Sequence, residues 1–493
     1  MTSLWLDRSP VRTYPSLAPG LRFDHIVVGG GLTGVATAML LARSGASVAL
    51  LEARDLGAVA TGNTTGKLSL LQGTHLSEIA ARHSDSSLRA YLEANRAGQR
   101  WLLEFCADHD IDVQREAAFT YAAAPESRAV VERELAACRT AGLEADWVDE
   151  VELPFPTYGA VRAGDQAQFD PMTVLHGLAA QAQRHGAVIS ENTRVTGISG
   201  DTVHTDLGDL HADSVVLATG TPILDRGAFF ARLEAQRSYA LAFEVPGSIP
   251  HGMYLSADSP TRSLRSAPTS AGELLLVGGN GHPVGREPET GSKVDELIEW
   301  TRTYWPTAQL THSWSAQDYS SIDALPYVGP LLPGSDRILV ATGYAKWGMT
   351  NGVAAALALT GRLLGATPAW APALEAWRPR ELAGLVSALA ANSKVGLALA
   401  GGWARAELHT TGDAPPEGTG YVHRDGVRPV ATCTVDGDTS TVSAICPHLY
   451  GVVRWNDAEK SWDCPLHGSR FAADGSVLEG PATRPLASRV FEY

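Results

Sequence analysis

The chain has 493 residues with 44% hydrophobic content and 49 glycines, which suggests about three domain-sized units of a glycine-loop-rich α/β protein. Its formal charge of −15 argues against nucleic acid and anionic membranes as partners, because phosphate binding needs clustered positive charge. Five cysteines in so long a chain do not form a disulfide framework.

The first element with a clear pattern is a βαβ unit. Residues 25–28 predict a short buried strand, residues 35–43 a helix and residues 47–51 a second strand. Between the first strand and the helix, Gly29, Gly31 and Gly34 supply a tight turn, a close backbone approach and helix packing, as a bound pyrophosphate requires. Glu52 ends the second strand, where a carboxylate can accept both ribose hydroxyls. The unit predicts a dinucleotide site.

The fingerprint alone does not separate FAD from NAD. No second copy is found, since the nearest candidate, residues 279–282, does not open an apolar helix. A reductase that binds both FAD and NAD(P)H is therefore disfavoured, and we expect one tightly held dinucleotide.

The following segments predict a second domain. Residues 76–110 carry apolar positions at helical spacing, and short strand-like runs suggest an antiparallel sheet that faces the substrate. These runs are residues 119–123, 238–245, 253–256 and 273–277. A helix at 171–185, a buried strand at 212–217 and a βα unit at 337–364 return the chain to the nucleotide domain.

In the last part of the chain the sequence pattern changes from helical segments to short strands and turns. Residues 371–404 predict a helical connector, whose apolar stretch 385–399 is shorter than the ~20 residues of a membrane span. Residues 405–493 predict a separate all-β module. Because residues 1–23 lack an apolar run of signal-peptide length, we expect a protein of the reducing cytoplasm with no membrane span.

The C-terminal module contains an iron-sulfur signature. Cys446 and His448 form one half and Cys464 and His467 the other, with 15 residues between the halves. Two such loops can hold two irons, one through both cysteines and the other through both histidines. A zinc finger would place its cysteine pair and its histidine pair in separate halves, so a 2Fe-2S cluster is the preferred prediction.

Residues 24–365 resemble the FAD-dependent family of D-amino-acid, glycine and sarcosine oxidases. The similarity is carried by residues 26–52, the stretch Thr61-Gly62-Asn63-Thr64-Thr65-Gly66-Lys67, the turn Ala218-Thr219-Gly220, residues 323–329, and Thr342-Gly343-Tyr344. The resemblance implies FAD, bound in part by Thr61, Thr64, Thr65 and Lys67, with Val195 against the adenine. Because the usual histidine or cysteine positions for covalent flavin attachment are not evident in this sequence, we expect the FAD to be non-covalent. Residues 348–351 would present backbone N–H groups to the flavin. The predicted cofactor-binding set is completed by Leu32, Thr33, Ala53, Thr219, Gly220, Gly343, Gly348, Met349 and Thr350.

The C-terminal module resembles Rieske ferredoxins and the Rieske domains of respiratory complexes, including Gly480-Pro481 beyond the second loop. The respiratory forms carry an extra disulfide, whose cysteine positions are occupied here by Gly451 and Leu466. No such bridge can form. Ser469 could donate a hydrogen bond to a bridging sulfide.

These resemblances imply a domain plan. Residues 1–370 would form the oxidoreductase unit, with FAD-binding parts at about 24–75, 165–225 and 320–365 and substrate parts at about 76–164 and 226–319. The candidate catalytic residues are Lys67, Tyr254, Arg265, His282 and Lys346, and Tyr239 and Tyr319 are further pocket candidates.

The leading functional hypothesis is oxidation of an amine or amino acid by FAD, followed by one-electron transfer through the Rieske cluster to an external acceptor. The second hypothesis reverses the flow: the cluster accepts electrons from a ferredoxin or reductase and reduces the flavin, for oxygen activation or substrate reduction. A third is an electron carrier without its own substrate, which the large second domain argues against. A Rieske oxygenase is disfavoured, since no paired histidines and carboxylate suit a mononuclear iron site.

Overall fold

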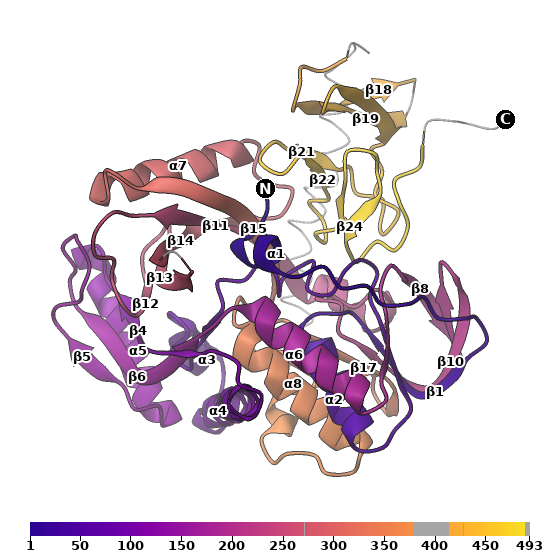
Figure 1. Ribbon diagram of the computed structural model, residues 1–493, viewed down its shortest axis with the longest axis horizontal. Coiled ribbons are helices and arrows are strands. Elements are labelled where there is room, and N and C mark those ends of the chain that lie inside the picture. Colours follow the sequence, from indigo (N-terminus) through magenta and orange to yellow (C-terminus); the bar gives the residue numbers. More distant parts are fainter. Residues whose placement is uncertain (271, 379–413, 427, 489–493) are drawn as a thin grey trace.

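The computed structural model describes residues 1–270, 272–378, 414–426 and 428–488. Two sheets with their helices form the larger part of the molecule, and the C-terminal strands form a separate unit above them (Figure 1). This is the predicted architecture of a Rossmann-like α/β unit, a second sheet domain and a C-terminal all-β domain.

The first sheet has a parallel core. Its strands are rich in valine, isoleucine and leucine, because both faces of a parallel sheet are covered. In spatial order they are β16 (Tyr327–Leu332), β17 (Ser335–Thr342), β10 (Gly208–Leu217), β1 (Arg22–Val28), β2 (Val48–Leu51) and β7 (Val188–Ser190). Only β16 joins this path in antiparallel register, and the hairpin β8 (Val195–Ser199) and β9 (Thr202–Thr205) attaches to β10.

Three helices pack against strands of this sheet: α2 (Leu32–Arg43), α6 (Pro171–Arg184) and α8 (Gly348–Leu363), and α2 also contacts both of the other two. Eleven of the twelve residues of α2 are buried, which explains why its sequence shows no polar stripe. The short α1 (Leu4–Arg8) contacts α6.

The second sheet is antiparallel apart from one pair, because β12 and β4 run parallel. Its path is β15 (Gln309–Ser321), β11 (Leu233–Glu244), β14 (Gly272–Pro283), β13 (Arg262–Thr269), β12 (Met253–Ser256), β4 (Gln114–Tyr121), β6 (Ala160–Gln168) and β3 (Lys67–Leu68), with β5 (Asp146–Val148) beside β6. The helices α5 (Arg128–Ala141) and α7 (Thr290–Tyr304) pack against its strands. Both β3 and the end of β6 lie in parts of the chain that the sequence predicted to bind FAD. In the structure they pair with each other, Lys67 opposite Gln168, and so belong to the second sheet.

The predicted helical segment 76–110 is two helices rather than one, α3 (His75–Arg82) and α4 (Asp85–Asp108). The break lies at His83 and Ser84. The Ser84 side chain accepts a hydrogen bond from the Ser87 backbone N–H and so caps α4.

The C-terminal domain contains two small antiparallel sheets. One joins β18 (Gly420–Asp425), β19 (Arg428–Val435) and β20 (Asp438–Ser443); the other joins β21 (Arg454–Asn456), β22 (Ser461–Asp463), β23 (Arg470–Phe471) and β24 (Val477–Glu479). Most of the predicted connector lies outside the described residues, and its first residues, Ala371–Leu374, form a 3-10 turn.

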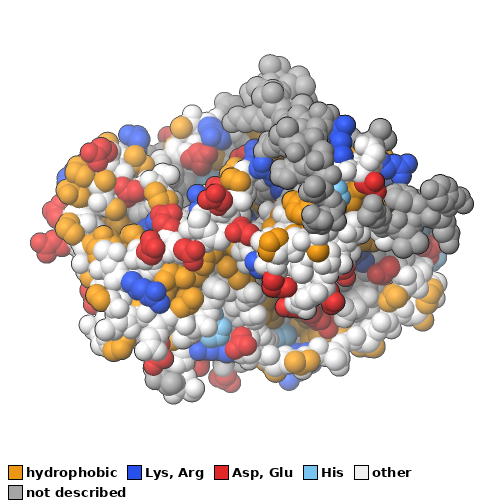
Figure 2. Space-filling view, turned by 90° about the horizontal axis from the view of Figure 1, so that it is seen from above, with side chains coloured by type: hydrophobic (Ala, Val, Ile, Leu, Met, Phe, Trp, Pro, Cys, Tyr) orange, Lys and Arg blue, Asp and Glu red, His pale blue; other side chains and the backbone are white. Residues whose placement is uncertain are grey.

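Viewed from the side of the C-terminal domain, the described surface carries acidic and basic side chains interspersed (Figure 2). Among the described residues, no helix combines the length and the apolar composition that a bilayer crossing demands.

Candidate functional site

The glycines of the fingerprint are required by close backbone contacts. A Cβ on Gly29 would lie 2.5 Å from the Ala218 carbonyl oxygen, and Gly29 has a positive φ of 109°. A Cβ on Gly34 would lie 1.9 Å from the Gly29 carbonyl oxygen. The turn therefore brings β1, β10 and the start of α2 together with no side chain between them, which fits a bound pyrophosphate.

Glu52 follows β2 and holds this loop. Its Oε2 accepts a hydrogen bond from the Gly30 N–H at 2.6 Å, and its Oε1 accepts one from the Arg54 N–H at 2.8 Å. Burial raises the pKa of the Glu52 carboxyl, although both hydrogen bonds and the nearby arginines oppose this. The side chain faces the cavity, so its remaining acceptor capacity is directed where a ribose is expected.

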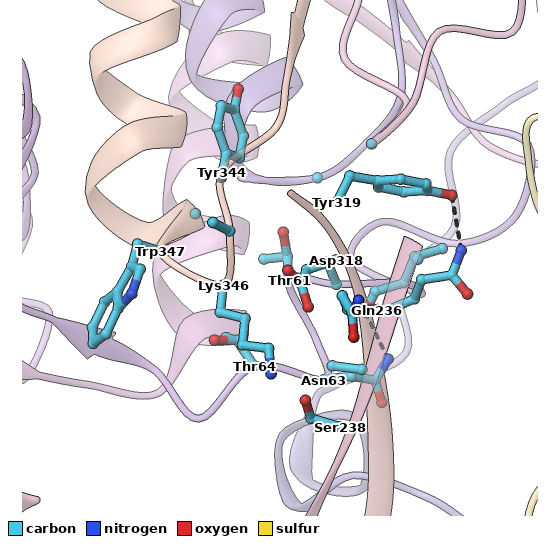
Figure 3. Close-up of a pocket in the computed structure, with 18 of the residues that line it drawn as sticks. Thr61, Asn63, Thr64, Gln236, Ser238, Asp318, Tyr319, Tyr344, Lys346 and Trp347 are labelled. Carbon is cyan, nitrogen blue, oxygen red and sulfur yellow. Dashed lines mark hydrogen bonds between the residues drawn. The ribbon is translucent and has the colours of Figure 1, made fainter. Parts of the chain in front are cut away.

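A cavity of about 1080 Å³ extends from this loop into the space between the two sheets (Figure 3). Its volume lies at the upper end of the range for ligand pockets, as a dinucleotide with a substrate would need. Most predicted cofactor residues line it: Gly29, Gly31, Leu32, Thr33, Glu52, Ala53, Thr61, Thr64, Thr65, Lys67, Val195, Thr219, Gly220, Gly343, Gly348 and Met349. Thr350 and Gly34 do not. The Thr350 hydroxyl donates to Asn95 Oδ1 within a buried polar network, and Gly34 packs beneath Gly29.

Lys67 lies in the cavity wall, and its ammonium group is held by two hydrogen bonds. Its Nζ donates to the Tyr254 carbonyl and to the Ser263 hydroxyl, each at 2.8 Å. Burial, reinforced by the charge of Arg265, lowers the pKa of Lys67 to about 7. The side chain can therefore hold or release a proton near neutral pH.

The other candidate catalytic residues divide into two groups. Lys346, Tyr239 and Tyr319 line the cavity, whereas Tyr254, Arg265 and His282 do not. The Tyr254 hydroxyl donates to the His251 carbonyl, and His282 Nε2 lies 3.0 Å from the Tyr239 hydroxyl. Arg265 donates to backbone carbonyls of residues 65, 66, 169 and 266, so its guanidinium supports the loop that carries Thr64 and Thr65. The pocket assignment of these three residues is not supported.

Asp318 is a cavity residue that the sequence analysis missed. It lies near the end of β15, among Thr61, Gln236 and Lys346 (Figure 3). Burial raises its pKa to about 6, while the Lys346 charge and backbone N–H lower it. The only signal in the sequence was an aspartate inside an otherwise strand-like run, and the alternation of side chains does not tell whether such a carboxylate faces a cavity.

The four predicted cluster ligands converge on two facing loops of the C-terminal domain. The His448 and His467 rings lie 5.1 Å apart, and a hydrogen bond between the two thiols lowers the pKa of Cys446 and raises that of Cys464. Among the described residues, no three histidine, cysteine, aspartate or glutamate side chains surround one point as the ligands of a single ion would. Two cysteines beside two histidines suit two irons with two protein ligands each.

The histidines offer the nitrogens that a cluster needs. His467 Nδ1 is buried and has no hydrogen-bond partner among the described residues, and burial lowers the pKa of His467 to about 3. The ring is therefore neutral, as a metal ligand must be. His448 Nε2 instead lies 2.6 Å from Asp225 Oδ1 in the loop after β10, which leaves its Nδ1 for the metal. These residues fit a 2Fe-2S cluster.

The predicted disulfide positions of the respiratory forms do face one another. A Cβ on Gly451 would lie 2.7 Å from Leu466 Cγ and 2.9 Å from Cys464 Sγ. Leu466 therefore fills the space between the two loops. The Ser469 hydroxyl, which is fully buried, accepts a hydrogen bond from the Ala482 N–H and also contacts the Cys446 sulfur.

The cluster domain forms part of the cavity wall. Leu478, Glu479, Gly480, Ala482 and Thr483 line it together with the nucleotide-binding residues. On the flavin side, Arg194 donates to the Val477 carbonyl at 3.0 Å and Arg54 to the Leu478 carbonyl at 3.5 Å. β24 and the segment that follows it thus cover the adenosine end of the predicted FAD site.

Strand β15 connects the cavity to the cluster loop. Gln317 Nε2 donates to the Gly468 carbonyl at 2.8 Å and to the Tyr319 hydroxyl at 2.8 Å. Tyr319 in turn donates to the Gly480 carbonyl at 3.3 Å. Because Gly468 follows the ligand His467, one strand separates the cavity from the cluster loop.

The interface also contains a buried ionic network. Arg237 of β11 pairs with Glu459 and Glu479 of the cluster domain, and Arg470 pairs with both glutamates and with Asp463. Although burial opposes it, Arg237 and Arg470 lower the pKa of Glu459 to about 2. The network joins the two domains through buried ion pairs.

Two family models match the chain. The model described as FAD dependent oxidoreductase matches residues 24–362, and the model described as Rieske [2Fe-2S] domain matches residues 410–490.

Two curated proteins illustrate the similarity. A Bacillus subtilis (strain 168) protein, YhfW, whose name describes a Rieske 2Fe-2S iron-sulfur protein, is 30% identical over 490 residues, which cover 98% of this chain and 96% of that protein. Glycine oxidase of Bacillus licheniformis is 26% identical over 344 residues, covering 66% of this chain and 89% of that protein.

Solved structures show the same fold. Glycine oxidase from Geobacillus kaustophilus superposes with a TM-score of 0.60 at 21% identity, covering 71% of this chain and 96% of that one. L-amino acid deaminase from Proteus vulgaris gives 0.61 at 15% identity, covering 75% and 99%.

Proposed function

The chain belongs to the FAD dependent oxidoreductase family and ends in a Rieske [2Fe-2S] domain, and we propose that it oxidises a C–N bond of an amine or amino acid and passes the electrons from FAD through the cluster to an external acceptor. FAD supplies two-electron hydride chemistry, whereas a 2Fe-2S cluster passes one electron at a time. An enzyme that holds both can convert a two-electron oxidation into one-electron steps.

The observation that carries the proposal is the contact between β15 and the cluster loop. Gln317 lines the cavity and donates to the carbonyl of Gly468, the residue after the ligand His467. A short path between the two sites is needed if they exchange electrons, and this contact provides one. An electron carrier without a substrate would not need the enclosed cavity beside the flavin site.

The chain itself prepares the site for this chemistry. The Gly29–Gly34 turn and Glu52 would hold the nucleotide, while the first turn of α8, from Gly348, directs backbone N–H groups to the cavity wall. Lys67, with a pKa of about 7, can hold or release a proton there. The cluster domain closes the adenosine end and so restricts water.

The external partner would approach the cluster from the first ligand loop. Tyr450, between Cys446 and Gly451, is 68% exposed, and the adjacent Pro447 is exposed as well. An exposed aromatic side chain next to a ligand loop suits a transient redox partner, whose interface is small.

Anaerobic titration of the holoenzyme with candidate amines and amino acids tests the proposal. Loss of flavin absorbance should be followed by the electron-spin signal of the reduced cluster. Cys464→Ala should abolish the cluster signal and leave flavin bleaching, whereas Cys433→Ala, which removes a buried cysteine of β19 outside the ligand loops, should change neither. Flavin bleaching without cluster reduction in the wild type would contradict the outward route, and cluster reduction by a ferredoxin followed by flavin bleaching would establish the reverse one.

A further inference from the structure

The side chains of strands β11 and β15 alternate between two faces, one directed to the cluster domain and the other to the cavity. In their antiparallel register Gln236 lies opposite Asp318, and Arg237 lies opposite Gln317. Arg237 and Gln317 contact the cluster domain. Because neighbouring residues of a strand point to opposite faces, Gln236, Ser238 and Asp318 share the other face, which borders the cavity.

Two polar atoms on this face are buried and lack partners. Asp318 Oδ2 and Ser238 Oγ each have no hydrogen-bond partner within the described parts of the chain. Buried polar groups of folded proteins are normally paired, so two unpaired atoms on one face of a cavity point to a bound group. A carboxylate and a hydroxyl on one face of a cavity can both accept hydrogen bonds from an N–H donor.

Each lysine and arginine among the described lining residues already has a partner or lies beside a carboxylate, so none is left to receive a substrate carboxylate alone. Among the described lining residues, the arginines are Arg54 and Arg194, and both donate to carbonyls of the cluster domain at the adenosine end. The Lys67 ammonium group already donates to two protein oxygens, and the Lys293 ammonium group pairs with Glu287 at 3.2 Å. The Lys346 charge acts on Asp318, and the negative charge of that carboxylate opposes an incoming substrate carboxylate.

We propose that the cavity takes a cationic amine without a carboxylate on the reacting carbon, and that Asp318 and Ser238 bind its ammonium group. This inference rests on the proposed oxidation of a C–N bond and narrows its substrate class. Asp318 supplies the charge that selects the amine, and Ser238 accepts a second N–H.

Three probes of similar shape test the charge preference. Tert-butylammonium, pivalate and 2-aminoisobutyrate carry one positive, one negative and both charges, and none has a hydrogen on the carbon that would be oxidised. Each is titrated into the FAD-loaded enzyme, and binding is read from the flavin spectrum and by calorimetry. We expect tert-butylammonium to bind at least about 10-fold more tightly than 2-aminoisobutyrate, and pivalate not to bind, because an unpaired buried charge is costly.

The isosteric variant Asp318→Asn should weaken tert-butylammonium binding about 10- to 100-fold while the flavin spectrum of the free enzyme stays intact. Asp165→Asn, at an acid whose side chain is 83% exposed, serves as the matched control and should change nothing. Tighter binding of pivalate or 2-aminoisobutyrate, or unchanged binding in the folded Asp318→Asn variant, would overturn the inference. Since the probes cannot be oxidised, the result is independent of turnover. The proposed function fails separately, if no oxidisable amine or amino acid bleaches the flavin.

Discussion

Replacing Arg237 by methionine should loosen the cluster domain from the flavin domain. Arg237 is 2% exposed and donates from Nη2 to Glu459 Oε1 at 2.5 Å and from Nη1 to Glu479 Oε1 at 3.2 Å. Methionine keeps much of the length and apolar area but removes the charge. Arg470 would then remain alone with Glu459, Glu479 and Asp463.

The size of the effect follows from the pKa of Glu459. Its value of about 2 lies below the ~4.3 of a free glutamate, which corresponds to about 3 kcal/mol of favourable interaction. Breaking a buried ion pair by removing one partner costs about 3–5 kcal/mol in general. Because Arg470 contributes part of the stabilisation of Glu459, we expect Arg237→Met to reduce the free energy of unfolding of the docked cluster domain by about 3 kcal/mol.

Urea unfolding of the holoenzyme measures this, with visible circular dichroism for the cluster and flavin fluorescence for FAD release. Both signals should change at lower urea in Arg237→Met. The matched control is Arg115→Met, at an arginine whose side chain is 44% exposed and pairs with Asp165, where the loss should be below about 1 kcal/mol.

The pH dependence has a defined sign. The pKa of Glu459 is lower in the fold than in the unfolded chain, so its contribution is complete above about pH 4.3 and is lost as the pH falls towards about 2. The wild type should therefore lose cluster-domain stability below about pH 4, and Arg237→Met should lose less. A variant as stable as the Arg115→Met control, or one with the full acid sensitivity of the wild type, would refute the reasoning.

Two further predictions concern single residues, and a third concerns a pair of facing residues. Burial lowers the pKa of Lys67 to about 7, so between pH 7 and about 10.4 the unfolded chain holds a proton that the folded chain has released. The free energy of unfolding should therefore rise by about 2 kcal/mol from pH 7 to 9, as measured by urea titration at each pH. Lys67→Met should remove this rise, and an equal rise in the variant would disprove the prediction. Glu52→Gln replaces one of two acceptor oxygens by a donor and should raise the Kd for FAD about 10-fold in a fluorescence titration, with unchanged affinity counting against the loop-holding role. The double variant Gly451→Cys with Leu466→Cys should form a disulfide, detected as loss of two free thiols, because the two side chains meet; two titratable thiols in the oxidised, folded variant would show the contact to be wrong.

The features that the sequence predicted correctly are those set by local geometry. The Gly29–Gly34 turn and Glu52 lie within one βαβ unit, so their spacing alone brings them together. The cluster ligands likewise lie on two short loops. The local motifs predicted a dinucleotide and a 2Fe-2S cluster, whereas the choice of FAD over NAD came from the resemblance to the amino-acid oxidases. The family matches confirmed both cofactors. The cap at Ser84 was also a local signal, and it was overlooked because the apolar spacing continues across it.

The features that the sequence did not reveal depend on long-range register. Asp318 borders the cavity only because β15 pairs with β11 so that it lies opposite Gln236. Arg265 was expected to line the pocket, but its guanidinium donates to the carbonyls of the turn at residues 65–66. Neither outcome can be read from residue type, since the partner is decided by strands distant in the chain.

The cluster domain contributes residues to the wall of the predicted FAD cavity and is held against the flavin domain by buried contacts. Inter-domain interfaces in one chain commonly permit relative motion, but here the interface buries charges that require their partners. Moving the domain away would expose Arg237 and Arg470, leave Arg54 and Arg194 without their carbonyl acceptors, and open the adenosine end of the cavity. These costs add up at one place, so domain separation and loss of FAD should occur as one event. A fixed domain also fixes the distance between the two cofactors, and electron exchange then needs no docking step within the molecule.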